Sequence, residues 1–266
     1  MKKVLSLYNK IIFINRFCTV WSSRVKLLRL TVKYMLAVRF KKVGLRMQSD
    51  QTIHQINVKY NGVCFPIYMR LQDISMLYEV WLDQSYKTDN IKIDKGAIVD
   101  LGAHVGFTTL YFWSLLGDDR NYIAIEGSSK NSKLLRMNTK AIHSCKIHES
   151  VITADGRKVK FYDEVSGHLH QVHITKGVEQ QSVSLTSIIN QEKVEAIAII
   201  KIDIEGMEHE ILQHNNGWLS STDQIFLELH QSIQNELLRS KMFNNGFDWK
   251  LSNGIIKLSR RDKNKT

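Results

Sequence analysis

The chain has 266 residues, of which 43% are hydrophobic and one is proline, a composition typical of a packed globular protein. Its net charge of +11 is concentrated at one end: residues 1–49 contain twelve Lys or Arg and no Asp or Glu, so the remainder sums to 11 − 12 = −1. That nearly neutral remainder argues against a nucleic-acid enzyme, and three widely separated cysteines (Cys18, Cys64, Cys145) favour a reducing, cytoplasmic setting without disulfides.

Residues 1–50 are predicted to form a basic, amphipathic N-terminal arm. Its longest uncharged stretch, Phe17–Ser23, is too short for a membrane span, and no signal-peptide cleavage site follows it. Two interpretations remain open: the arm packs on the main domain, or it lies peripherally on the anionic inner face of a membrane. Read as one helix, the arm aligns the following apolar residues on a single stripe: Ile14, Phe17, Trp21, Val25, Leu28, Val32 and Met35.

Residues 51–266 are predicted to form one α/β domain, in which alternating strands and helices indicate a mostly parallel sheet with helices on both faces. Hairpins across Asn61-Gly62 and Asn253-Gly254 open and close it, the second as an antiparallel edge. The predicted elements are strands at 55–60 and 63–69, a helix at 71–86, a strand at 97–101, a helix at 107–116, a strand at 122–125, a helix at 129–141, a strand at 146–152, short antiparallel strands at 159–162, 171–174 and 181–185, a strand at 196–204, a helix from 207, a strand at 224–229, a helix at 233–243, and strands at 247–252 and 255–259.

The string VDLGAHVGFTT, residues 99–109, joins a predicted strand to a predicted helix through two glycines. Gly102 and Gly106 leave room for a ligand against the main chain, and the helix directs its free N–H groups at that ligand. The dinucleotide signature would require a third glycine where His104 stands, and no phosphate-loop Gly-Lys-Ser/Thr follows. Asp100, at the end of the strand, is placed to reach the ligand.

Glu126, in the string AIEGSSKN, ends the next predicted strand, where a carboxylate can accept hydrogen bonds from both hydroxyls of a ribose. Gly127 follows it. A loop that lacks a pyrophosphate grip, together with this carboxylate, suits a cofactor that contains a ribose and charged amino-acid groups but no phosphate. The sequence therefore predicts a binding site for S-adenosylmethionine.

Two further strings place acidic residues at the ends of later strands. IIKIDIEGMEHEIL, residues 199–212, brings Asp203 and Glu205 to a strand-to-helix junction, and IFLELH, residues 225–230, ends with Glu228 and His230. Because ligands of open α/β sheets bind beyond the carboxyl ends of the strands, these side chains are expected to face the same crevice as Gly102.

In this order and spacing, the four strings resemble the FkbM family of S-adenosylmethionine-dependent O-methyltransferases, over roughly residues 70–260. The resemblance implies the class I methyltransferase fold, a Rossmann-like seven-stranded sheet whose last two strands form the closing hairpin. It also implies a sugar hydroxyl of a glycan or glycolipid as the acceptor. His104 and Gly127 depart from the Asn and Pro usual in the family. The expected cofactor-binding residues are Asp100, Gly102, His104, Gly106, Glu126, Gly127 and Asp203.

Methyl transfer to a hydroxyl requires alignment of the reacting atoms and a base that takes the proton. His230 is the first expected base, because the unperturbed pKa of histidine lies near neutrality, and Asp203 is the second. Alternatively, His230 only caps the following helix. His168, His170 and His173 do not have the spacing of a closed metal site, and no metal site is predicted.

Three functions remain open at this point. The first is an O-methyltransferase that acts on a sugar hydroxyl. The second is a methyltransferase for another small-molecule hydroxyl, including a metal-assisted variant of the kind that acts on catechols. The third is a non-catalytic cofactor-binding module that the basic arm docks to a membrane or partner.

Overall fold

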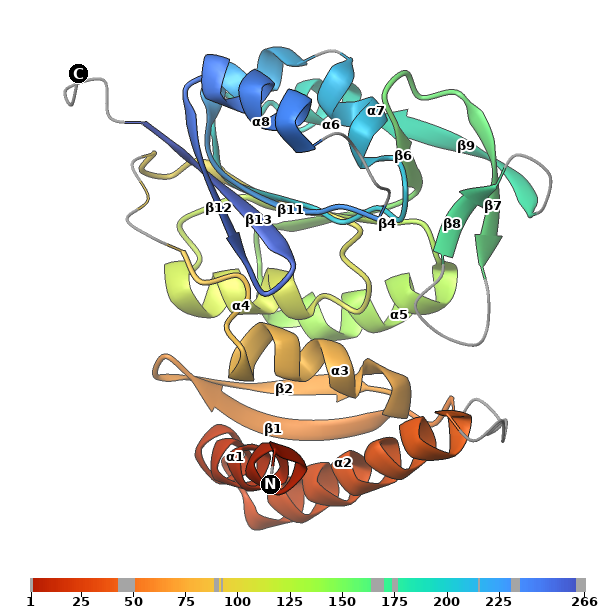
Figure 1. The fold of residues 1–266 in the computed structure, drawn as a ribbon, viewed down its shortest axis with the longest axis vertical. Coiled ribbons are helices and arrows are strands. Elements are labelled where there is room, and N and C mark those ends of the chain that lie inside the picture. The colour runs from red at the N-terminus through yellow and green to blue at the C-terminus, as the bar shows by residue number, and fades with distance from the viewer. Residues whose placement is uncertain are drawn as a thin grey trace.

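The computed structural model describes residues 2–42, 51–88, 91, 93–163, 170–173, 177–214, 216–230 and 235–261. Its elements form stacked layers, with a central sheet between two layers of helices and an N-terminal layer beneath them (Figure 1). The predicted boundary at residue 50 lies outside the described residues.

The central sheet has seven strands in the order β12-β13-β11-β10-β3-β4-β5. The neighbouring strands β5, β4, β3, β10 and β11 run parallel to one another, and β13 is antiparallel to both β11 and β12. This arrangement confirms the expected class I methyltransferase fold. The strands are β3 (Ala97–Leu101), β4 (Tyr122–Glu126), β5 (Cys145–Glu149), β10 (Ile197–Ile202), β11 (Thr222–Glu228), β12 (Phe247–Ser252) and β13 (Ile255–Arg260).

Helices cover both faces of this sheet (Figure 1). Strands β3, β4 and β10 are consequently buried along their whole length, and they are apolar except for Asp100, Glu126 and Lys201. Buried charges are costly unless they are paired, so these three residues must find partners. One face carries α4 (Phe107–Leu116) and α5 (Ser129–Asn138) with a 3-10 turn (Thr139–Ala141); the other carries α6 (Leu185–Gln191), α7 (Glu208–Gln213), a 3-10 segment (Asn216–Ser221) and α8 (Asn235–Asn244).

The strand predicted at 146–152 is wrong as a single element, because the chain divides at Ser150 between two sheets. The amide of Ser150 donates to the carbonyl of Glu126, and the residues after it join a separate sheet in the order β6-β9-β7-β8. His168 and the first residues of the helix predicted at 233–243 lie outside the described residues. The strands of this second sheet are β6 (Val151–Thr153), β7 (Lys158–Asp163), β8 (His170–His173) and β9 (Val178–Ser184).

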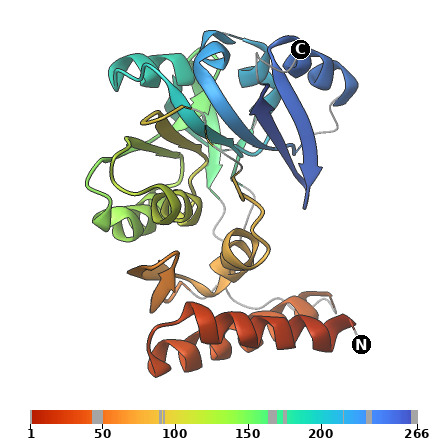
Figure 2. The ribbon, with the colours of Figure 1, turned by 90° about the vertical axis from the view of Figure 1, so that its left-hand side faces the viewer.

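The N-terminal layer consists of two helices packed on a two-stranded hairpin and on the segment that follows it (Figures 1 and 2). The predicted turn is confirmed: Asn61 and Gly62 both have positive φ, 46° and 84°, as a tight type I′ hairpin requires. The helix predicted at 71–86 ends at Leu82. The elements are α1 (Lys2–Phe17), α2 (Trp21–Lys42), β1 (His54–Tyr60), β2 (Val63–Met69), a 3-10 turn (Leu71–Asp73), α3 (Ile74–Leu77) and a π-helical turn (Tyr78–Leu82).

The prediction of one helix with one apolar stripe through the arm is wrong. The helix is interrupted between α1 and α2. There Cys18 forms an isolated antiparallel β-bridge with Val58, and the amide of Thr19 donates to the carbonyl of Asn57 at 3.0 Å. The side chains of α1 and α2 therefore do not continue one helical stripe from the first helix into the second. The stripe residue Phe17 is buried, whereas Trp21 is 73% exposed.

A continuous core links the N-terminal layer to the central sheet. The ring of Phe17 lies 5.3 Å from that of Trp81, which in turn lies 5.2 Å from the ring of Phe107 in α4. Ile14 and Leu27 belong to the same buried cluster. None of the helices in the described part of the chain combines the length and the apolar character needed to cross a membrane.

Candidate active site

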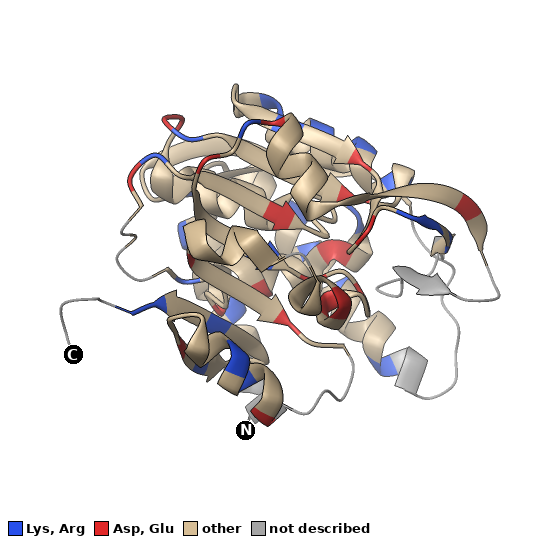
Figure 3. Cartoon of the chain, turned by 90° about the horizontal axis from the view of Figure 1, so that it is seen from above, with Lys and Arg blue, Asp and Glu red and all other residues tan. Residues whose placement is uncertain are grey.

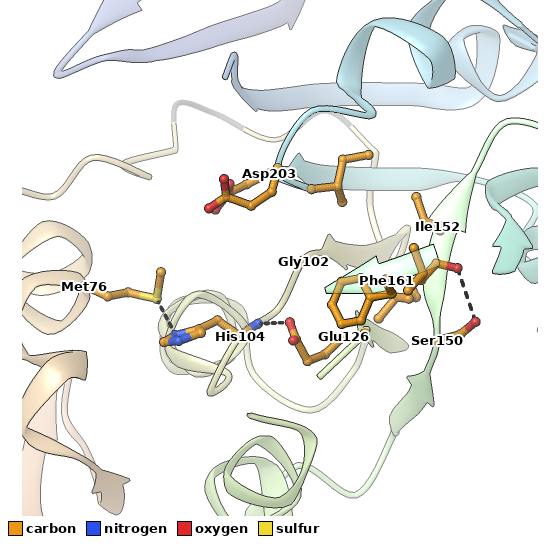
Figure 4. Close-up of a pocket in the computed structure, with 13 residues that line it drawn as sticks. Met76, Gly102, His104, Glu126, Ser150, Ile152, Phe161 and Asp203 are labelled. Carbon is orange, nitrogen blue, oxygen red and sulfur yellow. Dashed lines mark hydrogen bonds between the residues drawn. The ribbon is translucent and has the colours of Figure 1, made fainter. Parts of the chain in front are cut away.

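A pocket of about 670 Å³ opens at the carboxyl ends of β3, β4 and β10. The strand order reverses between β3 and β10, the place where open α/β sheets bind their ligands. Glu126 and Asp203 stand on opposite sides of the pocket with Gly102 between them (Figure 4). Ile152 in β6 and Phe161 in β7, two strands of the second sheet, form an apolar wall beside Glu126.

The glycine loop lies directly against the Asp203 main chain. Gly102 has a φ of 76°, and a Cβ atom built on it would overlap the carbonyl oxygen of Asp203. The amide of Asp203 in turn donates to the carbonyl of Leu101 at 3.1 Å. Gly102 is therefore required by both its conformation and its surroundings.

Glu126 is held by donors on three sides. Its Oε2 accepts from the His104 amide at 2.8 Å, and its Oε1 accepts from the Ser128 amide at 2.9 Å and from Nδ2 of Asn131 at 3.3 Å. Burial raises the pKa of Glu126, although these donors oppose the shift. A carboxylate has about four acceptor positions and these donors use three, so one position remains for a hydroxyl group in the pocket that Glu126 lines.

A buried polar chain connects this carboxylate to the N-terminal layer. The guanidinium of Arg70 donates to both carboxylate oxygens of Asp73 at 3.0 Å and to Oδ1 of Asn131 at 2.7 Å. Arg70 and Asp73 are 4% and 0% exposed, so each supplies the charge that the other needs. Asn131 is thereby fixed with its amide directed at Glu126.

Lys201 is the residue that sequence reasoning missed. Its ammonium group donates to the Gly102 carbonyl at 2.7 Å and lies 3.4 Å from Asp100 and 3.1 Å from Asp203. Burial alone would lower the pKa of Lys201, but the two carboxylates outweigh it and raise that pKa well above its usual value. The sequence contained a signal for this role, namely a lysine within an otherwise apolar strand, because a buried charge of this kind must be paired with an opposite charge.

Asp203 belongs to an acidic group around His230. Nδ1 of His230 lies 2.9 Å from Oε1 of the buried Glu208, and Nε2 lies 3.6 Å from Asp203, 3.6 Å from Glu205 and 3.8 Å from Glu228. The hydrogen bond to Glu208, opposed by burial and aided by Glu205 and Asp203, raises the pKa of His230 to about 9. At neutral pH His230 is therefore an imidazolium that offsets its carboxylate neighbours.

Glu205 is a pocket-lining carboxylate with unusual backbone geometry. Its φ of 54° is left-handed, which is uncommon for a residue with a side chain and is a form of strain found at functional sites. Glu208 fixes this turn by accepting from the Ile204 and Gly206 amides at 3.2 and 3.1 Å. Burial, with the nearby Asp203 and against the charge of His230, raises the pKa of Glu205 to about 7.

The acidic group also contains a set that could hold a metal ion. Asp203, Glu228 and His230 each offer one ligand atom, and these atoms lie within 4.8 Å of one another. This set is distinct from the histidines at 168–173 from which the sequence prediction of no metal site was argued. Metal binding would require His230 to lose the proton that its surroundings favour.

The structure divides the predicted site residues into three groups. Asp203 lines the pocket with Gly102, His104, Glu126 and Gly127. Asp100 and Gly106 lie outside that lining: Asp100 is fully buried and accepts from the Thr109 hydroxyl at 2.7 Å, and Gly106 begins α4 with a φ of 86°. His230 stands at the rim, joined to the pocket through Asp203 and Glu205.

Comparison with solved structures finds methyltransferases with low sequence identity. The chain is similar to the precorrin-6y C5,15-methyltransferase of Geobacter metallireducens, with 10% identity and a TM-score of 0.40 over 64% of this chain and 84% of that one. It is similar to Aeropyrum pernix fibrillarin in complex with S-adenosyl-L-methionine, with 10% identity and a TM-score of 0.39 over 81% and 84%. A chain of a fibrillarin/NOP5P complex gives 14% identity and a TM-score of 0.43 over 80% and 98%.

None of the curated proteins compared with the chain matches it. The model of the methyltransferase FkbM domain matches residues 100–249, more than half of the chain. This stretch begins at Asp100 in β3 and includes Glu126, Asp203 and His230. The chain therefore belongs to the FkbM methyltransferase family, and its cofactor is S-adenosylmethionine.

Proposed function

We propose that the protein methylates a hydroxyl group of a sugar in a glycan or glycolipid. The observation that carries this proposal is Glu205, a carboxylate at the pocket whose burial raises its pKa to about 7. A hydroxyl must lose a proton as it attacks, and a base whose pKa lies near the working pH accepts that proton most effectively. The resemblance of the chain to O-methyltransferases of this family supports the sugar acceptor.

The residues present fit the cofactor. Glu126 has the charge and one remaining acceptor position to bind a ribose hydroxyl, and Phe161 and Ile152 offer an apolar surface to the adenine ring of the cofactor. Asp203, across the pocket from Glu126, supplies a carboxylate to the ammonium group of the cofactor's amino-acid part. Gly102 keeps the space between them free of a side chain. When bound, the cofactor supplies an electrophilic methyl group.

We assign proton acceptance to Glu205 rather than to His230. His230 has a pKa of about 9 and so holds its proton at neutral pH, which leaves it without a free lone pair. It instead keeps the carboxylates of Asp203 and Glu205 close together by placing a positive charge 3.6 Å from each. The carboxylates around it, including Glu228, are acceptors for the other hydroxyls of a sugar.

The test is a mass-shift screen of a glycan and glycolipid panel with S-adenosylmethionine, followed by Glu205→Gln. This variant should lower turnover by about 10²- to 10⁴-fold, the usual contribution of a general base, while the melting-temperature shift caused by S-adenosylhomocysteine persists. Glu195→Gln, an exposed carboxylate before β10, is the matched control and should retain activity. Cofactor binding without methylation of any acceptor would instead favour a non-catalytic module.

Metal-assisted methyl transfer is the second candidate, and the set formed by Asp203, Glu228 and His230 is the observation that favours it. A divalent ion there would lower the pKa of a bound substrate hydroxyl, so that the hydroxyl would release its proton to water before the attack and would not need a dedicated base. Under the main proposal, EDTA leaves activity unchanged. A loss that magnesium restores would establish the metal-assisted reaction instead.

A further inference from the structure

The outer face of the helical pair α1–α2 exposes large apolar side chains. The pair forms one end of the molecule, with β1, β2 and α3 packed on its inner face (Figures 1 and 2). Trp21 is 73% exposed, Tyr8 60% and Leu36 48%. Single exposed apolar residues are common, but a group of them on one unpartnered face indicates an interaction surface.

In α2 these residues follow a helical spacing. The exposed Trp21, Val32 and Leu36, together with the half-buried Val25, lie on the side opposite the buried Leu27. An ordinary surface helix has its polar face on that outward side. Helix α2 is therefore apolar both where it meets the core and where it faces away from it.

Basic residues surround the apolar stripe. Arg29 and Arg39 are exposed on α2, and Arg16 is exposed at the end of α1. Residues 1–49 as a whole carry twelve basic residues and no acidic one. Elsewhere the two signs are interspersed, as Figure 3 shows for the upper side of the molecule. The outer face thus combines apolar side chains with a positive charge that the rest of the chain does not share.

We propose that the outer face of α1–α2 docks the protein on an anionic lipid bilayer. The helices lie in the plane of the interface, with Trp21, Val32 and Leu36 entering the boundary between headgroups and acyl chains and the arginines contacting the lipid phosphates. This inference is independent of the proposed acceptor. A bilayer explains both properties of the face, because it is apolar below its surface and negatively charged at it.

A second copy of the chain is the alternative occupant, and the charge argues against it. In a symmetric dimer through this face, the same surface of both copies would meet, and each would bring Arg29, Arg39 and no neighbouring acid from residues 1–49. Like charges that face each other repel, whereas an anionic surface attracts them.

The test is co-sedimentation of the full chain with vesicles of phosphatidylglycerol and phosphatidylcholine, and with vesicles of phosphatidylcholine alone. Binding should be stronger to the anionic vesicles and should fall as salt rises. Trp21→Ser with Leu36→Ser, and separately Arg29→Gln with Arg39→Gln, should each weaken binding by about tenfold or more. Leu251→Ser, which alters a 65% exposed leucine on β12, is the matched control and should bind as the unmodified protein does.

Three outcomes would overturn the proposal. The first is equal binding to both kinds of vesicle, or unchanged binding of either double variant. The second is a dimer in solution that Trp21→Ser with Leu36→Ser dissociates. The third is unfolding of that variant, which would mean that these side chains support the core. The melting-temperature shift with S-adenosylhomocysteine should stay the same in every variant, which separates this test from that of the proposed function.

Discussion

The structure makes a quantitative prediction for Glu126→Gln, a change that keeps the shape of the side chain and removes its charge. The carboxylate accepts from the His104 amide through one oxygen and from the Ser128 amide and Asn131 through the other. Glutamine has a single oxygen. If that oxygen keeps the two donors on the Ser128 side, the NH₂ group of the glutamine faces the His104 amide, and that partly buried N–H loses its acceptor.

An unsatisfied buried N–H costs about 1–3 kcal/mol, and Glu126 is only 6% exposed, so water replaces little of the loss. At about 2–4 °C per kcal/mol for a chain of this size, the melting temperature should fall by roughly 2–12 °C. A neutral acceptor also binds a hydroxyl about 1 kcal/mol less strongly than a charged one. For the one ribose hydroxyl that the remaining acceptor position can take, this amounts to roughly fivefold in cofactor affinity.

Thermal unfolding with and without S-adenosylhomocysteine, together with calorimetric titration, measures both effects. Glu149→Gln is the control, because Glu149 pairs in register with Glu126 on the neighbouring strand and has a side chain that is 43% exposed. It should change neither quantity. If Glu126→Gln lowers stability but binds the cofactor product normally, Glu126 supports the loop and does not contact the ribose. If neither quantity changes, the hydrogen-bond reasoning itself is wrong.

Three other predictions follow from the site. The kcat/KM of methyl transfer should rise with pH through about 7, because Glu205 must be deprotonated and burial holds its pKa there; a rise through about 9 in the pH–rate profile would identify His230 as the base instead. Gly102→Ala should abolish cofactor binding in calorimetry, because the new methyl group overlaps the Asp203 carbonyl; retained binding would show that the loop can move. Lys201→Met should lower the free energy of unfolding by about 3–5 kcal/mol in denaturant titration, since it leaves the buried Asp100 without its cation and leaves Asp203 with His230 alone; a loss below 1 kcal/mol would contradict that pairing.

The strands and the glycine loop could be predicted because their signals are local. Asn61-Gly62 specifies its turn through two residues with positive φ, and the four apolar residues of β3 favour the interior of the sheet. The meeting of Gly102, Glu126 and Asp203 followed from a rule about parallel strands: their carboxyl ends share one edge.

The rest depended on contacts that the linear pattern does not contain. The arm matched a single helix, but the hydrogen bond from Thr19 to Asn57 ends the first helix and rotates the second relative to it. The sequence placed Glu205 only at a strand-to-helix junction, and its left-handed backbone depends on the turn that Glu208 fixes by accepting from the Gly206 amide. His230 was judged by its unperturbed pKa, which the surrounding Glu208, Glu205 and Asp203 raise.

The aromatic contacts from Phe17 through Trp81 to Phe107 have a consequence for biosynthesis. Chains emerge from the ribosome with the N-terminus first, and folding follows this order where it can. Helix α1 is made before Trp81, whose ring packs on Phe17, and before Phe107, whose ring packs on Trp81. Phe17 therefore lacks this aromatic partner while β1 and β2 are synthesised. Helix α1 cannot complete its packing until the chain has been synthesised through the π-helical turn that contains Trp81.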